Sequence, residues 1–340
     1  MKKRIYIAYT GGTIGMKKSP QGYIPVEGYI TDVLNSMTEL KRAEMPEFTI
    51  SEYSPVIDSS NMSPRDWQYI ANDIKQNYAQ YDGFVVLHGT DTMAYTASAL
   101  SFMFQDLAKP VIVTGSQIPL SEIRSDGLNN LLNALYLAAN YPIYEVGLFF
   151  NNKLYRGNRA TKSDADGFNA FDSPNLPALV DAGIQIEVNS NLLLPKPKLT
   201  SQDNELNVIE IKDQPIGVVS LYPGISHLVI ANILAQPVNA LIIQSYGVGN
   251  APEDPKLLAE IKQANDRGIL VVNRTQCHRG RVFMDGYATG HALKEAGVLS
   301  AHDMTLEACL TKIHHLLSQN LPFEEVRMLF NKNLKGEMSV

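Results

Sequence analysis

Short apolar runs alternate, along the first half of the chain, with segments in which apolar residues recur every three or four positions. Such runs are typical of buried strands, and the recurring positions are typical of amphipathic helices. We predict strands at 5–9, 48–53, 83–87, 111–115 and 146–150, and helices at 30–37, 67–78, 93–103 and 126–140. Regular alternation of this kind indicates an α/β fold, with a mostly parallel sheet and helices on both of its faces.

The same alternation resumes after a connector that bears Pro, Asn and Ser and includes the Lys-Pro repeat at 195–198. Beyond the connector we predict strands at 217–221, 240–244 and 269–273, and helices at 226–234, 256–267, 305–317 and 323–329. We therefore expect a larger N-terminal domain over 1–190, a linker over 191–214 and a smaller C-terminal α/β domain over 215–340.

The first predicted strand ends in two glycines that are flanked by threonines, Thr10 and Thr13. Gly11 and Gly12 permit backbone angles that other residues avoid, so the chain can turn sharply there. The loop displays hydroxyl groups at the carboxyl end of a strand, where open α/β sheets bind their ligands. A glycine pair by itself more often makes only a turn. A site at this loop therefore requires polar partners from other strand ends.

Polar residues also follow the second predicted strand, where Asp58, Ser59 and Ser60 are adjacent in sequence. Part of this segment has a purely structural explanation, because Ser63 before Pro64 is a good N-cap for the next helix. That explanation does not account for the three residues ahead of it. Their carboxylate, hydroxyl and backbone N–H groups could bind a small ionic ligand.

The third predicted strand runs into the sequence HGTDT at 88–92. Asp91 or Thr92 is expected to cap the helix that follows. Thr90 and Asp91 nevertheless provide a second hydroxyl and a fixed anion beyond a strand end. By the rule for parallel sheets, both would face the same crevice as Thr13.

Tyr23 and Lys162 lie in segments without a periodic pattern. The polar stretch between Met16 and Tyr23 could be a mobile lid over a ligand, although an ordinary surface loop is the commoner explanation. Tyr23 could equally be a core or interface residue. Lys162 falls in a long irregular loop at 156–175, and such loops are often functional, although a solvated lysine is the default interpretation.

Composition narrows the class of protein. The 340 residues carry a net charge of −6, so no basic surplus is available for binding nucleic acid. The basic start, Lys2 to Arg4, lacks the apolar stretch of a signal peptide, and no window reaches the roughly 18 consecutive apolar residues of a membrane span. Cys277 and Cys309 are the only cysteines, too few to cross-link a secreted domain. We therefore expect a cytoplasmic protein with no nucleic-acid or membrane partner.

Common cofactor and metal motifs are missing from the sequence. The glycines that follow the first strand have the wrong spacing for a dinucleotide-binding loop, and no P-loop occurs. Ser226 resembles the serine of a nucleophile elbow but lacks the final glycine, so it is better explained as a helix N-cap. The histidines and cysteines show no zinc spacing, and the adjacent His314 and His315 cannot share a helix face. We expect neither a cofactor nor a metal.

Three motifs carry a resemblance to a known family. They are AYTGGTIG at 8–15, HGTDTMAYTASALSF at 88–102, and RATKSD at 159–164 ahead of FDSPN. Together they resemble the bacterial asparaginase family over nearly the whole chain, and most closely its cytoplasmic type I branch. The resemblance implies a larger N-terminal and a smaller C-terminal α/β domain. It also implies a homotetramer built from intimate dimers, with active sites at the dimer contact.

The resemblance further implies roles for the residues at the strand ends. Thr13, the second threonine of TGGTI, would be the nucleophile, and Tyr23 would supply the neighbouring hydroxyl on the lid. Thr10 would be structural. Lys162 would polarise the hydroxyl of Thr90.

Recognition of an amino acid follows from the same resemblance. Asp91 would bind the α-ammonium group, and Asp58, Ser59 and Ser60 would form the substrate-binding segment, with Ser59 on the α-carboxylate. Asn250, at the end of a GVGN stretch, would complete the site from the neighbouring subunit.

The implied activity is hydrolysis of L-asparagine to L-aspartate and ammonia through an acyl-enzyme. Glutamine is one methylene longer, and discrimination of one methylene is worth only about 1–3 kcal/mol, so the sequence does not reveal a glutaminase activity. One alternative is the ammonia-releasing subunit of a transfer-RNA-dependent amidotransferase, which has an extra domain ahead of the TGGTI strand. Another is a noncatalytic amino-acid sensor that uses Asp91 and Ser59, although a sensor needs no nucleophile.

Regulation is a separate question. Some cytoplasmic relatives bind a second asparagine as an effector at a subunit contact, and the residues around Thr161, Thr275 and Cys277 match that region in part. Gln244 stands where such relatives carry an arginine, so the sequence does not predict an effector site.

Overall fold

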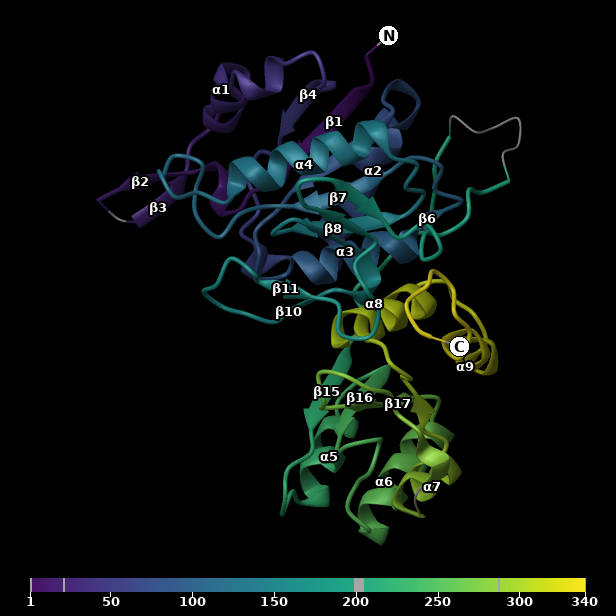
Figure 1. The fold of residues 1–340 in the computed structure, drawn as a ribbon. Helices are drawn as coiled ribbons and strands as arrows, with labels where there is room; N and C mark the ends of the chain where they lie inside the picture. The colour runs from purple at the N-terminus through teal and green to yellow at the C-terminus, as the bar shows by residue number, and fades with distance from the viewer. Residues whose placement is uncertain (1, 21, 199–204, 287, 340) are drawn as a thin grey trace. The chain divides into compact units, whose positions relative to one another are not determined.

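The computed structural model describes residues 2–20, 22–198, 205–286 and 288–339. The chain forms two compact units, Met1–Ile209 and Glu210–Val340. The boundary between them falls within the segment predicted as the linker, 191–214, of which 199–204 lie outside the described residues. Figure 1 shows the elements of both units.

The first unit is built on a mixed sheet that has, among the described residues, eight strands in the order β13-β12-β9-β8-β7-β5-β1-β4. The strands from β4 to β8 are parallel, as predicted, and Ile7 of β1 lies between Ile50 and Val85. Three antiparallel strands, which the sequence did not predict, extend the sheet beyond β8. The strand bounds are β1 Arg4–Tyr9, β4 Glu47–Glu52, β5 Gly83–Leu87, β7 Val111–Thr114, β8 Val146–Phe150, β9 Lys153–Arg156, β12 Val180–Ala182 and β13 Ile186–Val188.

Helices cover both faces of this sheet (Figure 1). Alternate residues of β1, among them Ile5 and Ile7, pack with α1 and α4. On the other face Tyr6 donates a hydrogen bond to Asp73 of α2 at 2.8 Å, and α3 is buried almost all round because its residues are apolar or small. The helix bounds are α1 Tyr29–Ser36, α2 Pro64–Asn77, α3 Met93–Met103 and α4 Gly127–Asn140.

The segment predicted as an aperiodic loop forms a hairpin. β2 Met16–Ser19 and β3 Gly22–Pro25 pair in antiparallel fashion, with Lys18 opposite Tyr23. Neither strand contains a buried residue, so the alternation by which strands are predicted is missing from both.

Two further pairs are β6 Phe104–Gln105 with β14 Asn207–Val208, and β10 Thr161–Lys162 with β11 Phe171–Asp172. One-turn 3-10 helices lie at η1 Thr13–Gly15, η2 Glu39–Lys41, η3 Ser59–Asn61, η4 Tyr78–Gln80 and η5 Gly157–Arg159.

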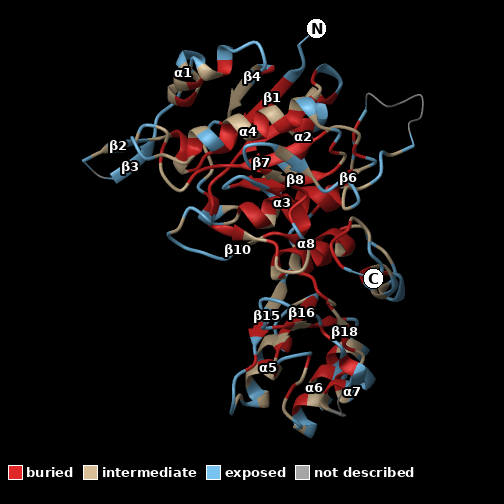
Figure 2. Cartoon of the chain, in the orientation of Figure 1, coloured by how far each residue is buried: buried red, intermediate tan, exposed pale blue. Residues whose placement is uncertain are grey.

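The second unit has a parallel sheet in the order β15-β16-β17-β18. One face packs against α5, α6 and α7 through residues such as Leu241 and Val271, and the other packs against α8 and α9 through residues such as Ile242 and Val272. Figure 2 shows the buried residues along these layers. The bounds are β15 Ile216–Ser220, β16 Ala240–Ser245, β17 Leu270–Thr275, β18 Leu299–Ser300, α5 His227–Leu234, α6 Pro255–Asp266, η6 Met284–Gly286, α7 Ala288–Glu295, α8 Leu306–Leu317 and α9 Phe323–Phe330.

The predicted strands and helices of the second unit are confirmed, whereas α7 and β18 are additional. Ser226 is the N-cap of α5, as expected, because its side chain accepts a hydrogen bond from Leu228 N. In the part of the chain that the structure describes, no helix is both long enough and apolar enough to cross a membrane.

A buried ion pair ties the last residues of the second unit to α8. The side chains of Lys312 and Glu337 are both 0% exposed, and Lys312 Nζ donates to Glu337 Oε1 at 2.5 Å and to Lys332 O at 2.6 Å. The backbone N–H groups of Leu334 and Lys335 donate to the same carboxylate. Burial lowers the pKa of Lys312, and the carboxylate beside it opposes that shift. Each charge is therefore tolerated in the core only because the other is present.

Glu337→Gln removes the neutralising charge and keeps the shape of the side chain. Because it leaves the Lys312 ammonium buried and unpaired, we expect the free energy of unfolding to fall by about 3–5 kcal/mol. Asp285→Asn is the matched control, since Asp285 pairs with Lys294 at the surface, where an ion pair contributes about 0–1 kcal/mol. Urea denaturation of both variants measures the difference. Equal stability of the two variants would contradict the prediction.

Candidate functional site

Three loops meet at the carboxyl ends of β1, β4 and β5 through contacts that only glycine permits. A Cβ atom at Gly12 would lie 2.4 Å from Gly89 N, and one at Gly11 would lie 2.3 Å from Ile57 O. A Cβ atom at Gly89 would lie 2.4 Å from Ser59 Oγ. Gly11 and Gly12 also have positive φ angles, 138° and 93°, which favour glycine. The structure therefore brings the loops that carry Thr13, Ser59 and Thr90 into direct backbone contact.

Thr10 joins the same loops by hydrogen bonds. Its N–H and its hydroxyl both donate to Leu87 O at 3.0 Å. Its carbonyl accepts from Ile57 N at 2.7 Å. The Thr10 hydroxyl is thus used within the edge of the sheet and is not available to a ligand.

Thr13 begins the turn η1 directly after the glycines. Its side chain is half-buried, and within the described residues its hydroxyl has no hydrogen-bond partner. On the buried side of the turn, the Tyr9 hydroxyl donates to Gly12 O at 3.5 Å, and a Cβ atom at Gly15 would lie 2.3 Å from the same hydroxyl. Burial raises the pKa of Tyr9, and the Glu52 carboxylate raises it further, so the phenol stays protonated.

Lys162 joins Thr90 and Asp91 into a polar cluster. Its Nζ donates to Thr90 Oγ1 at 2.9 Å and to Asp91 Oδ1 at 2.8 Å. The side chain of Lys162 is 20% exposed and that of Asp91 is 64% exposed, whereas Thr90 is buried. Lys162 reaches the cluster from β10, which pairs with β11 across the long loop. Residues about 70 positions apart in sequence are therefore held together at one strand end.

Gln117 extends this cluster, although the sequence analysis did not single it out. Thr90 Oγ1 donates to Gln117 Oε1 at 3.0 Å, and Gln117 Nε2 donates to Gly167 O at 3.1 Å. The backbone N–H of Gln117 donates to the Asp126 carboxylate at 3.0 Å, which anchors the loop. Gln117 follows β7, so the strand-end rule that selected Thr90 would have selected this residue as well.

Asp58, Ser59 and Ser60 form a turn beside the cluster. Asp58 Oδ1 accepts from Ser60 N at 3.0 Å, and Ser59 is buried. Thr92 Oγ1 donates to Ser59 O at 2.6 Å. Thr92 is the N-cap residue of α3, as one of the two alternatives expected, but no side-chain bond caps that helix. The Thr92 hydroxyl links two loops instead.

Tyr23 lies on the hairpin and is 45% exposed. With Gln117, Ile118 and Glu122 it lines a hollow of about 330 Å³. Gln117 therefore belongs both to this hollow and to the cluster around Thr90. Among the described residues, no hydrogen bond joins the Tyr23 hydroxyl to Thr13.

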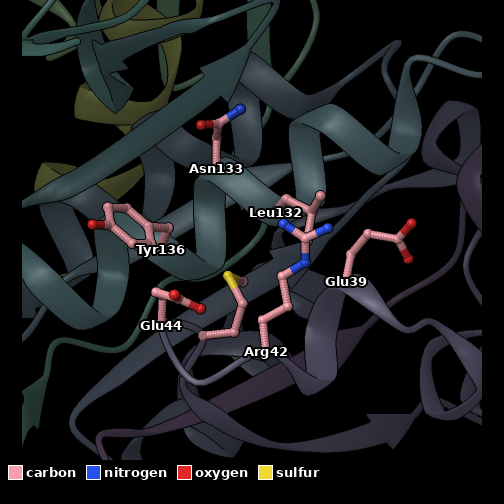
Figure 3. A pocket seen from close by; sticks show the side chains of 7 residues that line it. Glu39, Arg42, Glu44, Leu132, Asn133 and Tyr136 are labelled. Atoms are coloured by element: carbon pink, nitrogen blue, oxygen red, sulfur yellow. The ribbon is translucent and has the colours of Figure 1, made fainter. Parts of the chain in front are cut away.

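A different hollow, of about 350 Å³, lies against α4, and none of the strand-end residues Thr13, Ser59 and Thr90 lines it. Figure 3 shows Arg42 in it between Glu39 and Glu44, with Leu132 and Asn133 beside them. Groups of three or more His, Cys, Asp or Glu side chains placed to hold a metal do not occur in the described part of the chain. The cluster at the strand ends is therefore the candidate site.

Two further residues from the sequence analysis lie in the second unit. Asn250 Oδ1 accepts from Thr289 Oγ1 at 2.9 Å. Gln244 Oε1 accepts from Ser220 Oγ at 2.6 Å. Both side-chain oxygens are thus bonded within their own unit. The part of Asn250 in an active site stays a prediction, and for Gln244 no effector site was predicted.

Two family models match the chain in succession. The asparaginase N-terminal model matches residues 4–194, and the glutaminase/asparaginase C-terminal domain matches residues 215–330. The chain belongs to the asparaginase family.

Relatives extend this asparaginase assignment to the whole chain. L-asparaginase 1 of Escherichia coli strain K12 is 63% identical over 338 residues, which cover 99% of this chain and 98% of that protein. The crystal structure of L-asparaginase I from Vibrio cholerae has 60% identity and a TM-score of 0.93 and covers 100% of both chains. The thermostable L-asparaginase from Thermococcus kodakarensis has 31% identity and a TM-score of 0.86 and covers 99% of both chains. The first two likenesses agree with the type I branch that the sequence predicts.

His88, the first residue of the asparaginase motif HGTDT, received no role in the sequence analysis. It is 0% exposed, and burial lowers the pKa of its imidazole to about 4. The sequence could have indicated a role for His88, because it stands at the end of the apolar run of β5 and a buried polar residue needs hydrogen-bond partners.

Gly12→Ala in this asparaginase tests the contact between the loops. Gly22→Ala is the matched control, because Gly22 has a similar positive φ of 103° but no neighbouring atom within 4 Å of the place that an added Cβ atom would take. We expect the control to lose about 1–2 kcal/mol of unfolding free energy from backbone strain alone. Gly12→Ala should lose a further 1–3 kcal/mol, roughly, because the added methyl group meets backbone that no rotamer change can move. Chemical denaturation measures both losses. Equal losses of unfolding free energy in the two variants would show that the contact between Gly12 and Gly89 does not add to the cost of the substitution.

Proposed function

We propose that this protein hydrolyses L-asparagine to L-aspartate and ammonia, with Thr13 as the nucleophile. The supporting observation is a threonine hydroxyl without a hydrogen-bond partner among the described residues, on a loop packed against the loop that carries Thr90. Hydrolysis of a side-chain amide requires a nucleophile, a route for its proton and donors aimed at the developing oxyanion. The residues gathered at this sheet edge can supply all three.

The reaction proceeds in two steps. Thr13 Oγ1 bonds to the amide carbon of asparagine, its proton passes to the leaving nitrogen through Tyr23 or the Thr90–Lys162 pair, and the C–N bond breaks to release ammonia. Water next to Thr90 then attacks the resulting ester, which releases aspartate and returns the proton to Thr13. Backbone N–H groups near Thr13 and Thr90 stabilise the oxyanion in both steps, and one such donor is typically worth about 10²–10³ in rate.

Binding of the substrate is assigned to the charged and hydroxyl groups around the cluster. Lys162 occupies Oδ1 of Asp91, which leaves Oδ2 for the α-ammonium group of asparagine. The adjoining segment of Asp58, Ser59 and Ser60 offers hydroxyl and backbone donors for the α-carboxylate. An exposed carboxylate close to a buried serine suits a small zwitterion.

Thr13→Ala tests this proposal. The variant removes the nucleophilic hydroxyl together with one methyl group of a half-buried side chain. We therefore expect ammonia release from asparagine to fall at least about 10³-fold without loss of folding. Thr38→Ala is the matched control, since Thr38 is exposed on the surface of the same unit. A coupled ammonia assay on free L-asparagine, with no transfer RNA present, gives the rates, and circular dichroism checks the fold.

Two results would overturn the proposal. Full activity in Thr13→Ala would exclude Thr13 as the nucleophile. Calorimetric binding of asparagine to the wild type without ammonia release would identify a sensor instead of an enzyme.

A homotetramer in the cytoplasm is the proposed working form. Cys277 and Cys309 are free thiols, which a reducing compartment preserves. On the second unit, Val218, Tyr222 and Leu228 are 40%, 53% and 59% exposed, and large apolar side chains exposed close together in sequence suit a subunit contact.

Light scattering on the purified protein tests the assembly. We expect a molar mass four times that of the 37.6 kDa chain, because the asparaginase resemblance implies a dimer of dimers. Tyr222→Glu replaces one of these exposed apolar side chains with a charge and should shift the mass toward smaller species, whereas Lys18→Glu on the exposed hairpin should not. A wild-type protein that remains monomeric at micromolar concentration would contradict the expectation.

A further inference from the structure

His88 is a buried titratable residue of the HGTDT motif that the proposed reaction does not use. It follows β5 directly, and both of its ring nitrogens have partners. Nδ1 lies 2.7 Å from Gly89 O, and Nε2 lies 2.8 Å from Thr96 Oγ1 of α3. Trp67 Nε1 of α2 donates to the same Thr96 oxygen at 3.1 Å. A continuous chain of hydrogen bonds thus runs from α2 through α3 to the loop of the candidate site.

The chemistry of the partners decides which atom donates and which accepts in each of these hydrogen bonds. A carbonyl oxygen only accepts, so Nδ1 must carry the imidazole proton and donate it to Gly89 O. Burial keeps the ring neutral near pH 7, so Nε2 is an acceptor and takes the hydroxyl proton of Thr96. The indole N–H of Trp67 only donates, which satisfies the Thr96 oxygen in turn. Each proton is used once, and no other tautomer of His88 satisfies all the groups.

The bond to Gly89 O also sets the direction of the next N–H group. The peptide bond between Gly89 and Thr90 is planar and trans, so its C=O and its N–H point to opposite sides. Since His88 holds the carbonyl toward the protein interior, the N–H of Thr90 faces away from the buried ring. Within the described residues, Thr90 N has no hydrogen-bond partner, so it is available to a ligand.

We propose that His88 is a positioning residue that holds the Gly89–Thr90 peptide so that the Thr90 N–H donates to the oxyanion of the reaction. This inference rests on the proposed amide hydrolysis. It assigns a role in catalysis to a histidine that never touches the substrate. Trp67 and Thr96 serve the same role by fixing the tautomer of His88.

Two substitutions separate the hydrogen bond to Gly89 from the burial of the ring. His88→Asn places an amide nitrogen near the position of Nδ1, so it can still donate to Gly89 O but loses the contact with Thr96. His88→Gln places its amide near the position of Nε2, so it keeps the contact with Thr96 but loses the donor to Gly89 O. Both leave part of the imidazole volume empty, so both should lower the stability.

We expect His88→Gln to lower kcat for asparagine about 10²-fold, the typical loss of one oxyanion donor, with KM changed less than about threefold. His88→Asn should keep kcat within about fivefold of the wild type, because its amide still orients the peptide. Chemical denaturation of both variants, run at the assay temperature, confirms that each is folded. Equal losses of kcat in the two variants, or a loss confined to KM, would overturn the proposal.

A second measurement does not depend on turnover. Nitrogen-15 NMR of histidine-labelled protein at pH 7, with the His88 signal assigned by its disappearance in His88→Asn, reports the tautomer directly. We expect a neutral ring protonated at Nδ1, and protonation at Nε2 or at both nitrogens would overturn the inference whether or not the protein is active. Failure of the proposed function would appear separately, as a wild type that releases no ammonia while its His88 is protonated at Nδ1.

Discussion

Close contact between the backbones of three loops is the constraint on which the rest of the site depends. Gly12 lies against the backbone of Gly89, and Gly11 lies against that of Ile57, at distances that leave no room for a Cβ atom on Gly11 or Gly12. Parallel strands bring the loops to the same edge, but the missing side chains let them touch. Hydroxyl groups from separate parts of the sequence, those of Thr13 and Thr90 among them, can then serve one small ligand.

The fold was largely predictable because most of its elements bury one face. Apart from the two-residue strand β18 and the helix α7, the parallel strands of both sheets and the helices over them leave a hydrophobic period in the sequence and were predicted. The elements that were missed lack that signal. The hairpin of β2 and β3 buries no residue, so nothing in its pattern distinguishes it from a loop. The antiparallel strands β9, β12 and β13 are three or four residues long, too short for a period to appear.

The site could be predicted only as far as strand ends and motifs reveal it. Thr13, Ser59 and Thr90 lie on the loops that follow β1, β4 and β5, so the topology brings these loops to one edge of the sheet. Lys162 does not, because its place depends on the short pair of β10 and β11, and the family motif rather than the hydrophobic pattern identified it. The same strand-end rule could have identified Gln117. Its hydrogen-bond partners, the Thr90 hydroxyl and the Gly167 carbonyl, could be identified only from the structure.

Two series of hydrogen bonds converge on Thr90. Their donors and acceptors decide which groups of Thr90 remain free to bind a ligand. Gln117 Nε2 must donate to the carbonyl of Gly167, so its Oε1 faces Thr90 and accepts the only hydroxyl proton that Thr90 has. One lone pair of the Thr90 oxygen accepts from Lys162, and the other is left for a water molecule. From the opposite side, His88 turns the Gly89 carbonyl inward and leaves the Thr90 N–H free. Hydrolysis of an ester needs an acceptor for the attacking water and a donor for the oxyanion, and in the proposed reaction Thr90 would supply the first with its side chain and the second with its backbone.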